Sequence, residues 1–184
     1  DLYTDIFYSH YVLSRKGFFN DKPSGNTKLW GVFIIRNRIP IIRNMDLYYL
    51  GLMKSRAVWD DGAGKEVRHS VGTRLWNNSG EWKYDFEAVY QFGKMENKMI
   101  RAWTASINTS YTFSSKRFAP KIGLKTELIS GDRKYDDNHL QTFNPLFPRG
   151  GYFGLAALIG PGNLIGIHPS VSMVPANGLN ISFD

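Results

Sequence analysis

Alternation of apolar and polar side chains is the clearest pattern in the chain, and it is strongest over residues 66–130. Between Glu81 and Gly93 the even positions are apolar or aromatic, apart from the small Ala88, whereas the odd positions are mostly charged or polar. A period of two residues is typical of a β-strand with two unlike faces. Segments 66–76, 98–113 and 121–130 show the same period. We therefore expect four consecutive strands, each with one apolar and one polar face.

The connections between these strands keep the two faces consistent. Directly opposed residues of antiparallel strands point to the same side of a sheet, so each turn must pair apolar with apolar residues. Turns placed at 77–80, 94–97 and 114–119 do so, whereas a slip by one residue would mix the faces. The predicted pairs include Leu75 with Trp82, Phe92 with Met99, and Tyr111 with Ile122. The sequence thus predicts an all-β, antiparallel up-and-down meander.

Composition points this meander toward a membrane. The aromatic fraction of 15% is high, and aromatic residues on alternating strands are typical of outer-membrane β-barrels. The mean hydropathy of -0.32 agrees with such a barrel, because its strands alternate and need no long apolar run. The net charge of +7 favours a polyanionic partner. The absence of cysteine excludes disulfides and thiolate metal sites.

Five further segments are predicted as strands, at residues 2–14, 28–36, 45–56, 163–174 and 179–183. Segment 28–36 is apolar on both faces, which indicates either protein packed on its inner side or a register that the pattern leaves undefined. Long loops are predicted at residues 15–26, 57–65 and 131–162. All three fall at one end of the strands, which we assign to the outer side because outer-membrane barrels carry their longer loops there.

Residues 1–184 are expected to form a single β-barrel domain. The chain begins at Asp1 without Met or a signal peptide, and its last residues read as the middle of a strand. We therefore expect a fragment of a transmembrane outer-membrane β-barrel that lacks strands at both ends.

Catalytic and metal chemistry finds little support. The four histidines share no ligand spacing. The acidic stretch at Asp132, Asp136, Asp137 and Asn138 reads as a solvated loop, with a calcium site as the weaker alternative. Basic neighbours would keep Asp85 and Glu87 ionised, so neither can serve as a general acid. We expect no enzyme activity, no metal and no cofactor.

Several stretches resemble the alginate export porins of Gram-negative outer membranes. They are RHSVGTRL at 68–75, WKYDFEAVYQFG at 82–93, GLKTELISGD at 123–132, TFNPLFP at 142–148 and NLIGIHPSVSM at 163–173. The resemblance covers roughly the second two-thirds of the chain, and it lies in the order and spacing of the stretches. It implies a single-chain barrel with more strands than are present here. It also implies passive passage of a linear uronate polyanion through a lumen rich in arginine and lysine.

If the apolar faces contact lipid, the polar faces line the lumen. The candidate path residues are Arg68, Arg74, Lys83, Asp85, Glu87, Lys121, Lys125 and Glu127. The predicted register sets Arg74 diagonal to Asp85 and Arg68 diagonal to Glu87. Carboxylates in those places would hold the cations, yet let them exchange partners with a passing sugar carboxylate. The expected partners are an anionic polysaccharide or small anionic solute, outer-membrane lipid and periplasmic export components, and not nucleic acid.

Two alternatives remain open at this point. A porin of the same fold could carry a solute other than alginate, because family likeness does not settle the substrate. A soluble β-sandwich or barrel could bind carbohydrate with its aromatic residues packed inside. In that case Trp82, Phe86 and Ile107 would be enclosed in a compact interior.

Overall fold

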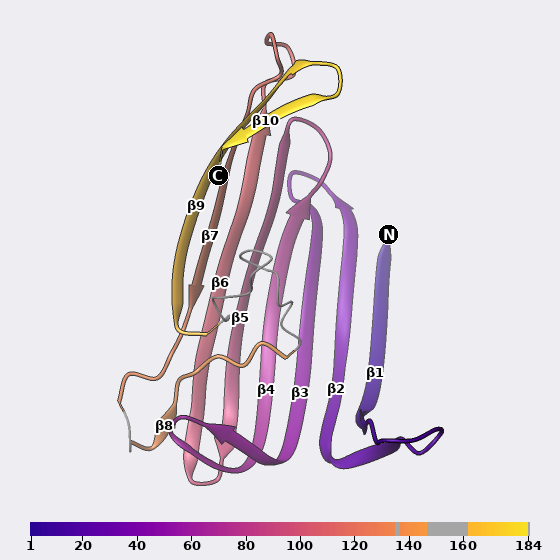
Figure 1. Cartoon of the computed structure of the whole chain (residues 1–184), viewed down its shortest axis with the longest axis vertical. Coiled ribbons are helices and arrows are strands. Elements are labelled where there is room, and N and C mark those ends of the chain that lie inside the picture. Colours follow the sequence, from indigo (N-terminus) through magenta and orange to yellow (C-terminus); the bar gives the residue numbers. More distant parts are fainter. Residues whose placement is uncertain (135–136, 147–161, 184) are drawn as a thin grey trace.

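The computed structural model describes residues 1–134, 137–146 and 162–183. They form one large sheet in the order β1-β2-β3-β4-β5-β6-β7-β9-β10, in which each of these strands pairs antiparallel with its neighbours (Figure 1). The strands are β1 (Leu2–Leu13), β2 (Lys22–Ile39), β3 (Arg43–Trp59), β4 (Gly62–Asn77), β5 (Trp82–Met95), β6 (Lys98–Thr112), β7 (Lys121–Ile129), β8 (His139–Leu140), β9 (Leu164–Ala176) and β10 (Leu179–Phe183). The all-β meander predicted from the sequence is confirmed.

Two of the predicted loops are shorter than expected. Residues 57–65 are mostly strand, because β3 and β4 continue to a tight turn at Asp60 and Asp61. Gly62 follows with φ of 127°, a backbone conformation that glycine adopts without strain. Strand β2 begins inside the predicted loop 15–26, where Pro23 pairs with Val12 after a register shift in β1.

The predicted registers are right for one hairpin and shifted in two. Tyr111 pairs with Ile122, as expected. Leu75, however, pairs with Phe86 and not with Trp82, and Phe92 pairs with Arg101 and not with Met99. The shifts are four and two residues, so the apolar and polar faces stay as predicted. The turns lie further along the chain than expected: 78–81 connects β4 to β5, and 96–97 connects β5 to β6.

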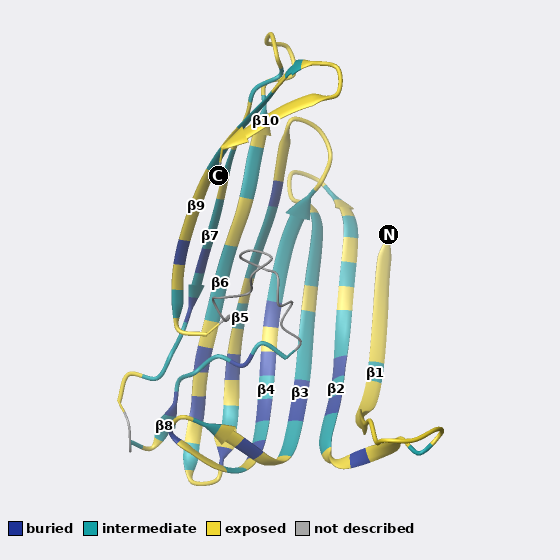
Figure 2. Ribbon diagram, viewed as in Figure 1, coloured by how far each residue is buried: buried dark blue, intermediate teal, exposed yellow. Residues whose placement is uncertain are grey.

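Apolar side chains of the sheet are unusually exposed to solvent, whereas several polar ones are buried. On the apolar face, which carries the alternating apolar side chains of every long strand, Trp82 is 53% exposed and Ile107 is 43% exposed. On the opposite, polar face, Glu66, Arg68 and Gln91 are buried. Figure 2 shows most of the buried residues in the lower half of the sheet, with a few higher up on β5, β7 and β9. A soluble domain has the reverse arrangement, with apolar side chains inside.

A segment of the β7–β9 connection lies against the polar face. Residues 139–146 begin with β8, which pairs parallel with β6, and then cross in front of β5 and β4 (Figure 1). Leu140 is fully buried against Met95 and Ile100. Leu146 lines a cavity together with Leu29 and Leu52. The segment therefore lies beside Leu29 of β2, which accounts for an apolar residue on the polar face of that strand.

The long connections 14–21 and 130–163 lie at the same end of the sheet, as predicted. The tight turns 60–61 and 96–97 lie there too, so connection length alone does not distinguish the two ends. None of the residues that the structure describes forms a helix long and apolar enough to cross a membrane.

Close packing across rungs of the sheet gives a first prediction, at Gly51 on β3. A methyl group there would collide with the indole ring of Trp30 on β2. Gly51→Ala is expected to lower the free energy of unfolding by about 1–3 kcal/mol, a typical cost of overpacking, measured by urea titration in detergent. Gly25→Ala is the control, because no atom lies within 4 Å of that added methyl group. Equal stability of the two variants would contradict this packing.

Candidate functional site

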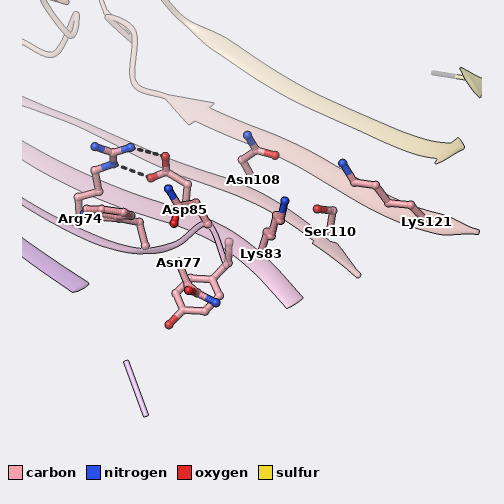
Figure 3. A pocket seen from close by; sticks show the side chains of 10 residues that line it. Arg74, Asn77, Lys83, Asp85, Asn108, Ser110 and Lys121 are labelled. Atoms are coloured by element: carbon pink, nitrogen blue, oxygen red, sulfur yellow. Dashed lines mark hydrogen bonds and ion pairs between the residues drawn. The ribbon is translucent and has the colours of Figure 1, made fainter. Parts of the chain in front are cut away.

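A polar groove of about 370 Å³ lies on strands β4 to β7, toward the end of the sheet that carries the 78–81 turn. Its lining residues are Arg74, Trp76, Asn77, Asn78, Lys83, Tyr84, Asp85, Asn108, Ser110 and Lys121. Arg74, Asp85, Asn108 and Lys121 point to the same side of the sheet (Figure 3). The register explains this common direction, because paired residues of antiparallel strands point to the same side of the sheet. Asp85 pairs with Asn108, and Lys83 pairs with Ser110 two residues further along the strands.

Arg74 is the most connected cation of the polar groove. Its Nε and Nη2 atoms donate to the two carboxylate oxygens of Asp85 at 2.7 and 2.5 Å. Its Nη1 atom lies 3.7 Å from Asp46 on β3. The side chain nevertheless remains 40% exposed, so a solute in the groove can reach it. The predicted contact between Arg74 and Asp85 is confirmed.

The carboxylates around Arg74 are held by neutral donors as well. The indole nitrogen of Trp76 lies 3.2 Å from both carboxylate oxygens of Asp46. The hydroxyl of Tyr48 donates to Glu87 at 2.5 Å. Glu87 also stands directly opposite Arg74 in the register. These contacts fix a charged network across β3, β4 and β5, in which one cation, Arg74, lies among three carboxylates.

Arg68 has a different environment from the one predicted. It stands opposite Gly93, because of the four-residue register shift, and its carboxylate partner is Glu66 at 2.5 Å and not Glu87. Its guanidinium lies 5.0 Å from the ring of Trp59, and both charged side chains of the pair have 0% exposure. A cation buried this deeply is tolerated because it is paired and hydrogen-bonded.

Arg68 and Gln91 together hold residues 139–146 of the β7–β9 connection, which we call the inward segment. We call this arrangement of the two side chains the clamp. The Gln91 side-chain oxygen accepts from Arg68 Nη1 at 2.8 Å and from the backbone N–H of Asn144 at 2.9 Å. The Gln91 Nε2 atom donates to the Asn144 carbonyl at 2.9 Å and to Ser70 Oγ at 3.1 Å. Arg68 Nη1 also donates to the Thr142 carbonyl at 3.1 Å. The side-chain amide of Gln91 therefore accepts two hydrogen bonds and donates two, which link the sheet to the segment.

The eight sequence-predicted path residues fall into separate environments. Arg74, Lys83, Asp85 and Lys121 meet in the polar groove, and Glu87 lies beside it. Lys125 is half-buried on the same face, opposite Asn108 and His168. Arg68 belongs to the clamp, and Glu127 is buried opposite Ser106.

Three residues around these sites were missed by sequence reasoning. In the alternation of β5 Gln91 looks like any other polar residue, and Asp46 and Tyr48 lie on β3, for which no register is predicted from the sequence. The alternation in β3 does place Asp46 on the face of Arg74, which is the signal that an explicit β3–β4 register would have used.

The described residues contain no group of three or more His, Asp or Glu side chains that could hold a metal ion. Of the acidic stretch weighed as a calcium site, Asp136 lies outside the described residues. Asp137 accepts a hydrogen bond from the backbone N–H of His139 at 2.7 Å, which is a local turn contact.

A single antiparallel sheet with an exposed apolar face and a charged groove on its polar face is built like part of the wall of a β-barrel pore. The family model described as alginate export matches residues 4–183, so the chain belongs to the alginate export family. The match includes β1, β2 and β3, which carried no distinctive motif. Searches among curated proteins and among solved structures returned no match.

The clamp generates a second prediction. Gln91→Leu removes the partners of the Asn144 N–H and C=O groups, and buried groups left unpaired cost about 1–3 kcal/mol each. Chymotrypsin should then cut near Leu140 and Phe143 at least about tenfold faster than in the wild type, read by mass spectrometry of the fragments. Asn108→Leu, an exposed amide on the same face, is the control and should leave the cleavage rate unchanged. Wild-type resistance in Gln91→Leu would show that other contacts hold the segment.

Proposed function

We propose that the chain forms part of the wall of a channel in the Gram-negative outer membrane, and that an anionic polysaccharide of the alginate type, or a smaller anionic solute, passes through it passively. The observation that supports this proposal most strongly is the exposure of the two sheet faces, which is the reverse of that in a soluble domain. Apolar side chains are exposed, and several charged side chains are buried. The family's described activity, alginate export, is transport and not catalysis.

The height of the apolar face supports placement in a bilayer. Trp82 and Phe92 mark the two ends of this face on β5, ten residues apart. At about 3.4 Å per residue and a strand tilt of about 40°, they are separated by about 26 Å along the membrane normal. The apolar band of outer-membrane barrels is about 25 Å tall. The face thus has the height that a bilayer requires.

Aromatic side chains cluster at both ends of the apolar face, where the two membrane interfaces would lie. Near the 78–81 turn, the Trp82 ring lies 4.9 Å from Tyr84, and Tyr84 stacks on Phe86 at 5.1 Å. Near the opposite end, His69 stacks on Phe92 at 5.3 Å and on Tyr49 at 5.9 Å. Two aromatic girdles at the membrane interfaces are characteristic of transmembrane barrels.

We assign the solute path to the cations of the polar groove. The Arg74–Asp85 pair is partly exposed, 40% for Arg74 and 37% for Asp85, so a passing sugar carboxylate can approach the guanidinium from the groove. Arg74 can then share its N–H donors between Asp85 and that carboxylate. Lys83, Lys121 and Lys125 extend the positive charge along β5 and β7. Cations that keep protein carboxylates as partners attract an anionic solute and also release it.

The remaining predicted path residues take supporting parts in this proposal. Asp85 and Glu87 hold Arg74 and keep the groove from binding a polyanion too tightly. Arg68 acts through the clamp, because its guanidinium has no exposed surface for a solute. Glu127 belongs to the buried wall next to the groove. Outer-membrane lipid would cover the apolar face, and periplasmic export components would meet the channel at one of its ends.

The soluble alternative is disfavoured by the same exposures. A carbohydrate-binding sandwich would enclose Trp82 and Ile107 in a core, and both are about half exposed. A channel of the same construction for another anionic solute remains the second candidate, because the polar groove selects charge and not one particular sugar.

Reversal of two groove charges tests the path. In the full-length protein, Lys83→Glu with Lys121→Glu should lower the anion-to-cation permeability ratio at least about tenfold, because a unit charge at about 4 Å contributes about 1 kcal/mol even in water. The ratio is measured from reversal potentials in planar bilayers under a salt gradient. Lys16→Glu, in the 14–21 connection, is the control. Unchanged selectivity in the double variant would remove both lysines from the path.

A charge placed on the apolar face tests the membrane. Ile107 lies near the middle of the apolar height, where an arginine facing lipid costs about 2–4 kcal/mol. Ile107→Arg should lower the free energy of unfolding, measured for the protein in lipid vesicles, by that amount. Asn108→Arg, one residue further on the polar face, should cost much less. Equal costs would mean that the apolar face does not contact lipid.

A further inference from the structure

Two charged residues lie on the apolar face of β5 and β6: Lys94 and Arg101. The structure describes every residue of these two strands. Arg101 is exposed and stands between Met99 and Trp103, opposite Phe92 at one end of the apolar height. Arginine on the lipid side of a barrel is tolerated near the interface and not at the midplane. The position of Arg101 therefore coincides with the headgroup zone of the bilayer proposed above, on which this inference rests.

Beside Arg101 the sheet has a notch, since β7 ends at Ile129 and β9 begins at Leu164 while β6 continues to Lys98. The notch has a volume of about 680 Å³. It is lined by Arg101, Trp103, Leu128, Ile129, Ser130, Gly131, Asp132, Arg133, Gln141, Asn163, Leu164 and Ile165. This volume lies within the range of about 300–1,000 Å³ that small-molecule sites occupy, and it far exceeds the space that a simple ion needs.

The wall of the notch is firmly built. The Ser130 hydroxyl donates to the Gln141 carbonyl at 2.8 Å and accepts from the Trp103 N–H at 2.8 Å. The Ser130 N–H donates to the Trp103 carbonyl at 2.9 Å, and its carbonyl accepts from Phe143 N–H at 3.2 Å. Ser130 thus ties the end of β7 to both β6 and the inward segment, so the notch is a fixed feature of the fold.

The chemistry of the notch divides into a charged part and an apolar part. Arg101 and Arg133 bring two positive charges, and Asp132 brings one negative charge, so the net charge is positive. Both Asp132 carboxylate oxygens are buried and have no hydrogen-bond partner among the described residues. Trp103, Leu128 and the largely exposed Ile165 continue from the notch onto the apolar face. Two guanidinium groups next to an apolar strip match a phosphate that carries hydrocarbon chains.

We propose that this notch binds an anionic phospholipid, with its phosphate on Arg101 and Arg133 and its acyl chains along Trp103, Leu128 and Ile165. The transported polyanion is a poor candidate for this site, because Trp103, Leu128 and Ile165 of the notch lie on the apolar face, whereas the polar groove lies on the opposite face. Binding of the lipid would neutralise Arg101 and seal the wall where β7 and β9 end short of β6.

Native mass spectrometry of the full-length protein in detergent tests the proposal. Added phosphatidylglycerol should give bound states with at least about tenfold higher affinity than phosphatidylcholine of the same chains. Arg101→Gln with Arg133→Gln should abolish that preference. Lys94→Gln is the matched control, since Lys94 is a cation on the same face and at the same end that does not line the notch, and it should keep the preference.

Three outcomes would overturn the proposal. They are equal binding of the two lipids, an unchanged preference in the double arginine variant, and displacement of the lipid by millimolar inorganic phosphate, which would indicate a small-anion site. Resistance of the folded barrel to SDS verifies that each variant folds. Anion selectivity in planar bilayers separates the two proposals, because the double variant should keep wild-type selectivity. Lost lipid preference with wild-type selectivity supports the notch, whereas failure of the channel proposal would appear as absent selectivity in the wild type.

Discussion

Two-residue alternation, carried through β4 to β7 by pairings without a register shift, is the constraint on which the rest of the structure depends. Each directly opposed pair of residues places its two side chains on one side of the sheet, so one odd slip would exchange apolar and charged residues along a whole strand. The exposed Trp82 and the charged network around Arg74 both follow from that single rule.

The same rule explains how much of the fold could be predicted from the sequence. Most of the strands, their antiparallel order and the two faces of β4 to β7 were accessible, because parity depends only on the residues. The contact between Arg74 and Asp85 also survived a four-residue register error, since the two residues stay close enough in either register for a long side chain to reach. The registers of the β4–β5 and β5–β6 hairpins were not accessible, because apolar residues recur so regularly that several even offsets look equally good.

The clamp was beyond sequence reasoning for a different reason. Nothing in the alternation of β5 distinguishes Gln91 from its polar neighbours, and its partner Asn144 lies more than fifty residues away in an irregular segment. Arg68 was assigned to the lumen because its parity is right, yet parity cannot tell an open surface from one that another part of the chain covers. Long-range hydrogen bonds between side chains and backbone leave no periodic trace.

The clamp also bears on how wide a bore the proposed channel would leave open. Strand number fixes the circumference of a barrel, but the free cross-section depends equally on what is folded inside it. In such a barrel the backbone of residues 139–146 would occupy part of that area, held by Gln91, Arg68 and Ser130. The calibre of the pore would then be set separately from its architecture, by the side chains that fasten one connecting segment and not by the number of strands.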